Sequence, residues 1–170
     1  MKFTCNKTEL SEAILNVQRA VSGKSSVPVL EGILIRTDEN KVILSGYDLE
    51  IGITTEILAC VEKHGEVVLK AKLLADAVRC MPEELITFYI DDRLIADITC
   101  GNVNYQIVGI SSAEFPDFPS FEGIQSIEME ANSLKNMLKQ TKFAIADASQ
   151  KPVYTGALFD IKVNDMTIVS

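Results

Sequence analysis

The chain is poor in the residues that metal sites and many catalytic sites require. Its 170 residues include one histidine, His64, four cysteines and no tryptophan. The cysteines are far apart and form no CxxC pair, so a zinc site would have too few ligands. We therefore expect no metal and no cofactor, and we expect the cysteines to remain thiols, as is usual in a reducing compartment. They are Cys5, Cys60, Cys80 and Cys100.

Motifs of the common enzyme classes are also missing. The chain contains no GxGxxG, no P-loop, no HExxH and no GxSxG. Asp48 and Glu50 are two residues apart and would share a face of an extended segment, so an acid–base pair or a metal site is one enzyme hypothesis. They follow Gly46-Tyr47 at a strand junction, where acids commonly bind turn amides. We expect no catalytic residue and a protein that is not an enzyme.

Long apolar runs are absent, and the first residues do not have the pattern expected of a secretory leader. No run reaches 18 apolar residues, and Met1–Cys5 has the alternation of a strand rather than a charged segment followed by an apolar one. The expected location is cytoplasmic, with no membrane partner.

What the chain does contain, three times, is a helical segment that is apolar on one side and basic on the other. The segments lie within 4–22, 69–81 and 128–146, and each is expected to follow a short strand. At 100° per residue, Lys72 and Arg79 lie together, opposite the apolar stripe of the second segment. The stripes are Leu10, Ile14, Val17 and Val21, then Leu73, Leu74, Ala77, Val78 and Met81, then Leu134, Met137, Leu138 and Thr141.

Charge is distributed unevenly between these segments and the rest of the chain. Residues 6–24, 70–81 and 132–143 carry nine basic and three acidic side chains, a net +6, which leaves −14 for the remainder of a chain whose total is −8. A polyanion such as DNA would be attracted to the helices and repelled elsewhere. The alternative is that the lysines only confer solubility. Arg19 points away from its stripe, and a ridge on the third segment consists of Lys135, Lys139 and Lys142.

The strand pattern predicts an α+β fold with internal duplication. Residues 1–60 and 62–110 share one order, namely a strand, a helix and three further strands. Helices are expected on one side of antiparallel sheets, with each domain built from a pair of such halves. The six later strands are predicted at 32–37, 41–47, 51–59, 85–90, 93–100 and 103–110.

Residues 111–123 interrupt this pattern with two prolines and three phenylalanines, which indicates a linker pressed onto the domains that it joins. We predict a complete domain at 1–120 and the start of a second domain at 121–170. The second would have a strand and helix, then strands at 153–163 and from Met166 onward. Because its last strand stops mid-run, we expect a fragment of a longer protein.

Six short motifs are weak alone but fairly specific in their order and spacing. They are MKFT at 1–4, VPVL at 27–30, YDLE at 47–50, KAK at 70–72, AEFP at 113–116 and KPVYTG at 151–156. With the duplicated halves, they make the whole chain resemble the bacterial sliding clamps, the β subunits of DNA polymerase III. In that family threonine usually precedes Asp48-Leu49-Glu50, and Tyr47 departs from this pattern.

The resemblance implies a DNA-clamp fold in a ring of two identical subunits, each with three similar domains. Helices would line the hole and encircle double-stranded DNA without sequence specificity. The implied role is that of a processivity factor that tethers the replicative polymerase. The implied partners are polymerase III subunits, the clamp loader, other proteins with a clamp-binding motif, and a second subunit in the full-length homodimer.

The resemblance also implies roles for particular residues. Lys24, Lys72 and the loop with Gln150 and Lys151 match positions that contact DNA, and helix geometry adds Arg79 beside Lys72. The dimer interface would involve Ile107 on strand 103–110 and, on the second helix, Leu73 and Leu74, for which a plain core position is the alternative. A pocket for partner peptides would include Tyr154 and Thr155.

A different class of function fits the same charge pattern. The chain could be a non-catalytic α+β interaction module whose basic helices dock an acidic protein. Charge alone does not separate this hypothesis from DNA binding, whereas three more strand–helix repeats in a longer gene product would favour the clamp.

Overall fold

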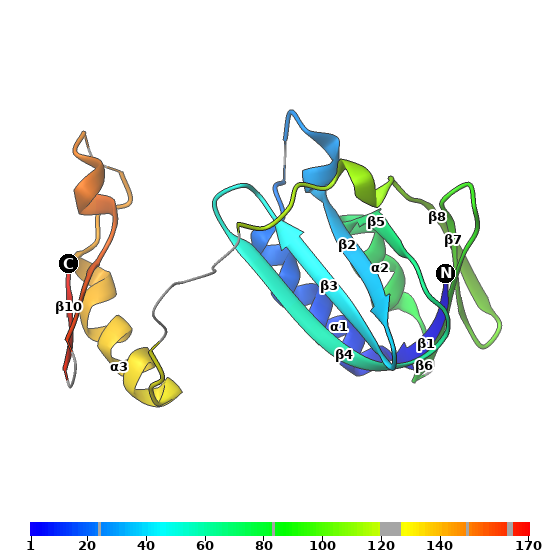
Figure 1. The fold of residues 1–170 in the computed structure, drawn as a ribbon, viewed down its shortest axis with the longest axis horizontal. Coiled ribbons are helices and arrows are strands. Elements are labelled where there is room, and N and C mark those ends of the chain that lie inside the picture. The colour runs from blue at the N-terminus through cyan, green and yellow to red at the C-terminus, as the bar shows by residue number, and fades with distance from the viewer. Residues whose placement is uncertain (24, 83, 120–126, 149, 163–164) are drawn as a thin grey trace. The chain divides into compact units, whose positions relative to one another are not determined.

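The computed structural model describes residues 1–23, 25–82, 84–119, 127–148, 150–162 and 165–170 (Figure 1). The chain divides into two compact units, Met1–Ser120 (unit 1) and Phe121–Ser170 (unit 2). No helix in these described ranges is long and apolar enough to cross a membrane.

Unit 1 contains the duplicated order that the sequence predicts. The first half is β1 (Lys2–Asn6), α1 (Lys7–Val17), β2 (Gly32–Asp38), β3 (Lys41–Tyr47) and β4 (Gly52–Lys63). The second half is β5 (Glu66–Lys70), α2 (Ala71–Cys80), β6 (Leu85–Ile90), β7 (Ile95–Cys100) and β8 (Val103–Val108). Short 3₁₀ turns are η1 (Gln18–Ala20), η2 (Pro28–Glu31) and η3 (Ser112–Glu114).

All eight strands form one antiparallel sheet in the order β5-β2-β3-β4-β1-β6-β7-β8. The sheet closes because Ile110, just beyond β8, pairs with Val68 of β5 through two backbone hydrogen bonds of 2.8 and 3.1 Å. The two halves therefore meet at two joints, β1 with β6 and β5 with β2. The α+β prediction with antiparallel sheets is confirmed.

The predicted limits of β4 and β7 are wrong, and β8 ends at Val108 rather than at the predicted Ile110. The strand predicted at 51–59 continues to Lys63 as β4, because its residues 52–58 pair with β3 and its residues 59–63, which include the polar Glu62 and Lys63, pair with β1. Backbone pairing at this corner outweighs side-chain polarity. β7 begins at Ile95 rather than Arg93, because Asp91 Oδ1 accepts hydrogen bonds from the backbone N–H groups of Arg93 and Ile95 and forms a turn there.

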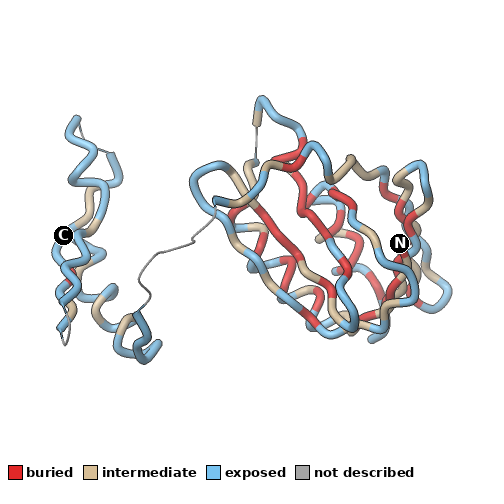
Figure 2. Tube along the Cα trace, in the orientation of Figure 1, coloured by how far each residue is buried: buried red, intermediate tan, exposed pale blue. Residues whose placement is uncertain are grey.

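The core of unit 1 lies between the sheet and the two helices, which contact each other on one side of the strands (Figures 1 and 2). Leu10, Ile14 and Val17 of α1 are buried, as their helical spacing predicts. The side chain of Asn6 caps α1 by accepting from the backbone N–H of Thr8 at 2.8 Å.

The linker after β8 packs on unit 1, as its phenylalanines predict. Phe115 is only 7% exposed, and the ring of Phe118 lies 5.0 Å from that of Tyr47. Gly52 is needed beneath it, because a Cβ there would lie 2.3 Å from the Phe118 ring. Phe121 lies outside the described residues.

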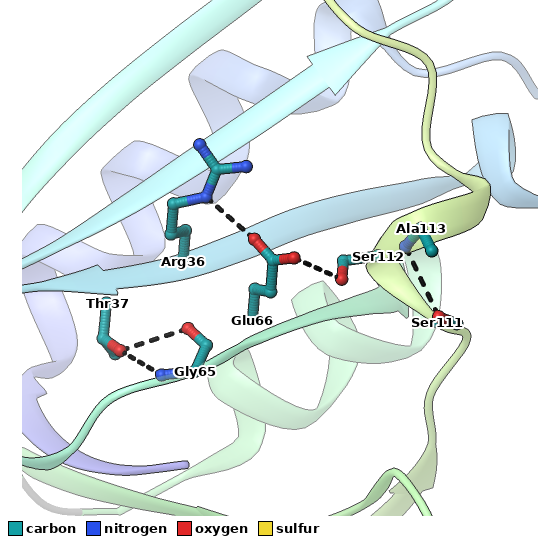
Figure 3. A network of polar contacts seen from close by, with 7 residues as sticks. All are labelled: Arg36, Thr37, Gly65, Glu66, Ser111, Ser112 and Ala113. Carbon is teal, nitrogen blue, oxygen red and sulfur yellow. Dashed lines mark hydrogen bonds and ion pairs between the residues drawn. The ribbon is translucent and has the colours of Figure 1, made fainter.

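Glu66 ties this linker to the sheet (Figure 3). Its carboxylate accepts a 2.6 Å hydrogen bond from the Ser112 hydroxyl and a 2.9 Å bond from Arg36 Nε on β2. The hydroxyl bond, and then the Arg36 bond and charge, lower the pKa of the Glu66 carboxyl below its ordinary value of 4.5. The linker is therefore held most firmly when Glu66 is ionised.

We expect this attachment to weaken in acid. A lowered folded-state pKa contributes stability that is fully present above pH 4.5 and is lost as pH falls through the folded value. Because both partners of the ion pair are partly exposed, the global effect should stay below about 0.5 kcal/mol. NMR shifts of the Ser112 and Ala113 amides between about pH 6 and about pH 3 would report the change. The prediction would be contradicted if the Ser112 and Ala113 amide shifts changed with pH in the same way in the Glu66→Gln variant.

Unit 2 contains α3 (Ala131–Thr141), the 3₁₀ turns η4 (Lys142–Ala144) and η5 (Pro152–Thr155), and the hairpin β9 (Leu158–Ile161) and β10 (Met166–Val169). α3, η4 and η5 each start 124 residues after α1, η1 and η2 (131 − 7, 142 − 18, 152 − 28). Unit 2 thus repeats the first half of unit 1 up to the counterpart of β3.

Two predictions for unit 2 are wrong. Residues 127–130 form no strand before α3, although 124 residues earlier the equivalent residues belong to β1. β1 is held between β4 and β6, and no described strand of unit 2 occupies those positions. The strand expected from Val153 starts at Leu158 instead, because Pro152 begins a 3₁₀ turn in place of extended backbone.

Candidate nucleic-acid interface

Lys72 and Arg79 lie on one face of α2, as the helical spacing predicts. Both are exposed, and both line a cleft of about 280 Å³ between α1 and α2. The apolar stripe of α2 holds this face outward, because Leu74 and Val78 are almost completely buried on the other side. The cleft also receives Gln18 of η1.

Arg79 is already engaged with an acid on its own helix. Its Nη2 atom lies 2.8 Å from Asp76 Oδ1, one helical turn earlier. Spacing alone placed Arg79 beside Lys72, and the structure shows that Arg79 also pairs with Asp76. Of the two basic residues on this face, Lys72 is the one for which no ion pair is found within the described residues.

Removing the Asp76 carboxylate, which pairs with Arg79, should strengthen DNA binding. We expect Asp76→Ala to raise the affinity of the chain for duplex DNA roughly three- to tenfold at low salt and to steepen the salt dependence, because Arg79 becomes free for a phosphate. Fluorescence anisotropy with a labelled duplex would measure both effects.

The matched control is Asp97→Ala on β7, which changes net charge equally but lies on the outward side of the strand, where its carboxylate binds Gln106 at 2.7 Å. An equal rise in both variants would show that only total charge matters.

A second, larger cleft of about 680 Å³ lies at the start of α2. Lys70, Lys72, Ser22 and Gly23 line it together with the acidic Glu31, and within the described residues no side chain caps the first turn of α2. The uncapped N–H groups at this helix N-terminus and the two lysines favour an anion, while the carboxylate of Glu31 opposes one. Lys24, predicted to contact DNA from the same loop, lies outside the described residues.

The charge count treats the basic residues of α1 and η1 alike, as groups that attract a polyanion, but Lys7 and Arg19 have different roles. Lys7 donates its Nζ hydrogen bond to the backbone carbonyl of Met81, at the C-terminal end of α2, and so serves the packing of the two helices. Arg19 is exposed on η1, beyond the end of α1. Sequence periodicity placed both residues on helices but did not separate the two roles.

In unit 2 the predicted basic ridge is present. Lys135 and Lys139 on α3 and Lys142 on η4 are all exposed. Gln150 and Lys151 are exposed in the loop before η5, where Lys151 Nζ lies 5.8 Å from the centre of the Tyr154 ring.

Tyr154 and Thr155, the two residues predicted for a peptide pocket, line a cleft of about 760 Å³. The Tyr154 side chain is available there, since the residue is 57% exposed. The Thr155 hydroxyl donates a 2.8 Å hydrogen bond to the carbonyl of Pro152 and so closes the 3₁₀ turn.

The structure separates the three residues predicted for self-association. Leu73 is 52% exposed on α2, whereas Leu74 is fully buried and Ile107 of β8 is 6% exposed. The core alternative therefore holds for Leu74, and Ile107 contributes mainly to the core. Sequence reasoning missed Tyr105, which lies two residues before Ile107 on the same face of β8 and is 36% exposed.

Of the two acids weighed for catalysis, Asp48 has structural partners. Asp48 Oδ1 accepts hydrogen bonds from the backbone N–H groups of Glu50, at 2.9 Å, and Ile51, at 2.7 Å. These bonds lower the pKa of Asp48 and hold the turn in which Leu49 adopts a φ of 76°. Asp48 is therefore a turn residue. Within the described residues, no group of three or more metal-ligating side chains is found.

The fold that presents these residues is that of the sliding clamps. A sliding clamp from Bacillus subtilis has a TM-score of 0.91 at 28% identity, over 95% of this chain and 45% of that one. One from Bartonella birtlesii, solved bound to griselimycin, has a TM-score of 0.89 at 27% identity, over 99% and 45%.

The sequence comparison identifies the family. The model of the DNA polymerase III beta subunit, N-terminal domain, matches residues 1–119, and the chain belongs to this family. The beta sliding clamp of Synechococcus elongatus is 34% identical over 92% of this chain and 42% of its own length. The chain thus spans a little under half the length of the curated relatives it matches.

Proposed function

We propose that this chain forms part of a sliding clamp that encircles duplex DNA and tethers the replicative polymerase. The observation that carries the proposal is the family match over unit 1, combined with helices that present exposed basic residues on one face. In this role the protein is a processivity factor without chemistry of its own, and it works in the cytoplasm, where the chromosome is replicated.

Under this proposal α1, α2 and α3 face the DNA. Lys72 and the uncapped start of α2 supply the strongest contact in unit 1, and Lys24 follows in sequence directly after Gly23, which lines the same cleft. Arg19, Arg79 and the ridge of Lys135, Lys139 and Lys142 extend the basic lining. Gln150 and Lys151 add a contact from the loop before η5. Such contacts go to phosphates and carry no sequence information, which suits a ring that must slide.

Ring closure would use the open edge of β8 together with α2. Leu73, Tyr105 and Val108 are exposed apolar residues there, and Ile107 supports them from the core. The partner-peptide pocket would include Tyr154, with Thr155 fixing the turn beneath it. The polymerase, the clamp loader and other proteins with a clamp-binding motif are the expected occupants.

The test uses a full-length protein that carries these 170 residues, loaded onto nicked circular DNA by its loader. One sample stays circular, a second is linearised, and both receive moderate salt. Retention on the circle with loss from the linear DNA is the expected result, because a closed ring can leave only at an end. Equal loss from both would favour the alternative, an interaction module whose basic helices dock an acidic protein.

A further inference from the structure

A cleft of about 770 Å³ lies in unit 1 on the side of the sheet away from α1 and α2. Its floor is made by strand residues that alternate with the core. Ile33 and Ile35 of β2 belong to the core beneath the helices, whereas Leu34 and Arg36 line the cleft. One wall is the linker from Ser112 to Phe118, part of which Figure 3 shows beside β2 and β5. The volume lies within the range of about 300–1,000 Å³ that is usual for ligand sites.

The floor consists of two rows of side chains that cross the strands. Cross-strand pairing sets the residues of each row opposite one another, and the second row lies two residues further along each strand. At about 3.4 Å per residue, the rows are about 7 Å apart. The hydroxyl row is Leu34, Ser45 and Thr54, and the charged row is Glu66, Arg36, Ile43 and Glu56.

The end of the cleft at the hydroxyl row is apolar. Phe115 packs in one cluster with Leu34, and Phe118 packs on Tyr47, which pairs with Gly52 next to this row. The two phenylalanine rings lie 6.4 Å apart, and both line the cleft. This end therefore offers aromatic surface to an apolar side chain.

The end at the charged row is acidic. Glu56, Glu66 and Asp117 line the cleft, against one basic residue, Arg36. Arg36 pairs with Glu66 at 2.9 Å, and Glu56 uses its Oε2 atom for Lys41, also at 2.9 Å. For Asp117 no ion pair is found in the described part of the chain, and the residue is exposed. The negative charge that remains, on Asp117 and around Glu56 Oε1, favours a cationic group.

We propose that this cleft binds an extended segment of a partner protein in which an apolar side chain is followed, two positions later, by arginine or lysine. Side chains two apart in an extended segment point the same way and lie about 7 Å apart, which matches the separation of the rows. The apolar side chain packs against Phe115 and Phe118, and the basic one is placed at Glu56 and Asp117. The proposal goes beyond the clamp function and does not depend on DNA binding, because the cleft lies on the other side of the sheet from the helices.

NMR titration of the ¹⁵N-labelled 170-residue chain provides the first test. The probe is a six-residue peptide with leucine at its second position, arginine at its fourth, and glycine or serine elsewhere. We expect the Ser45, Thr54 and Ser112 amides to shift, with a dissociation constant below about 1 mM. A peptide of the same composition with leucine and arginine adjacent should bind at least about threefold more weakly, since the two side chains then point to opposite sides. Equal affinity for the two peptides, or no shift of these amides up to about 5 mM peptide, would overturn the proposal.

A pair of matched variants tests the acidic end. Glu56→Gln should weaken binding of the first peptide about three- to tenfold, because a charge that meets the arginine is lost. The control is Glu62→Gln, since Glu62 is also exposed on β4 and pairs with a lysine of the neighbouring strand, Lys2, at 2.7 Å. The side chains of Glu56 and Glu62 are 54% and 50% exposed, so neither change should disturb the fold. The control should weaken binding less than about twofold. Equal weakening in the two variants would overturn the proposal, because it would show only a general attraction to a chain of net charge −8.

Discussion

Phe3→Ala should lower the free energy of unfolding of unit 1 by about 3–5 kcal/mol. Phe3 is fully buried on β1, and its ring stacks on that of Phe88 on β6 with centres 4.7 Å apart and planes 8° from parallel. The stack lies at a joint between the two halves, so truncation leaves a cavity where the halves meet. The loss is a large part of the ~5–15 kcal/mol that stabilises a typical domain.

Urea unfolding followed by tyrosine fluorescence would measure this loss, since Tyr47, Tyr89 and Tyr105 lie in unit 1. The matched control is Phe143→Ala, because Phe143 on η4 is 84% exposed and its truncation should change stability by less than about 0.5 kcal/mol. Equal losses in the two variants would show that the stack is not what holds the halves together.

Gly46→Ala should destabilise unit 1 by about 1–3 kcal/mol, although it adds one methyl group. A Cβ at this position of β3 would lie 2.6 Å from the carbonyl oxygen of Val17 and 2.8 Å from Val17 Cγ1. The clash involves a backbone atom of Val17 at the end of α1, so a change of side-chain rotamer cannot relieve it. The methyl group must push the end of α1 and η1 away from the sheet, and Arg19 moves with them.

The control for this variant is Gly23→Ala. A Cβ at Gly23 meets no atom within 4 Å, so the substitution should leave stability unchanged or raise it slightly. Chemical denaturation gives the difference, and hydrogen exchange of amides in η1 locates it. A Gly46→Ala protein as stable as Gly23→Ala would mean that α1 does not approach β3 as closely as described.

Much of unit 1 could be predicted from its sequence because the signals are local. The apolar stripes of α1 and α2 repeat at helical spacing, and Asn6 provides a cap where the first helix begins. Alternating strands and short turns set the limits of β3 and β6 to the residue. The repeated order within residues 1–110 then predicted the duplicated α+β architecture.

The sequence predicted where the basic residues of the site lie, but not which of them are already engaged by other side chains. Spacing placed Lys72 and Arg79 on one face, and the structure agrees. It did not show that Asp76 binds Arg79, because residues three apart on a helix are neighbours but only their side-chain rotamers decide whether the charged groups meet. Nor did it distinguish Leu73 from Leu74, since the edge of an apolar stripe depends on how the helix is rotated against the sheet.

By itself the sequence determined the helices, most of the strands, the duplicated halves and the family, because these follow from the order and spacing of residues along the chain. Only the tertiary structure decided that β4 runs to Lys63, that Lys7 binds the end of α2, and that residues 127–130 form no strand. Each of these depends on a partner far away in the sequence. A strand exists only beside another strand, and a lysine is free for DNA only when no carbonyl or carboxylate has already engaged it.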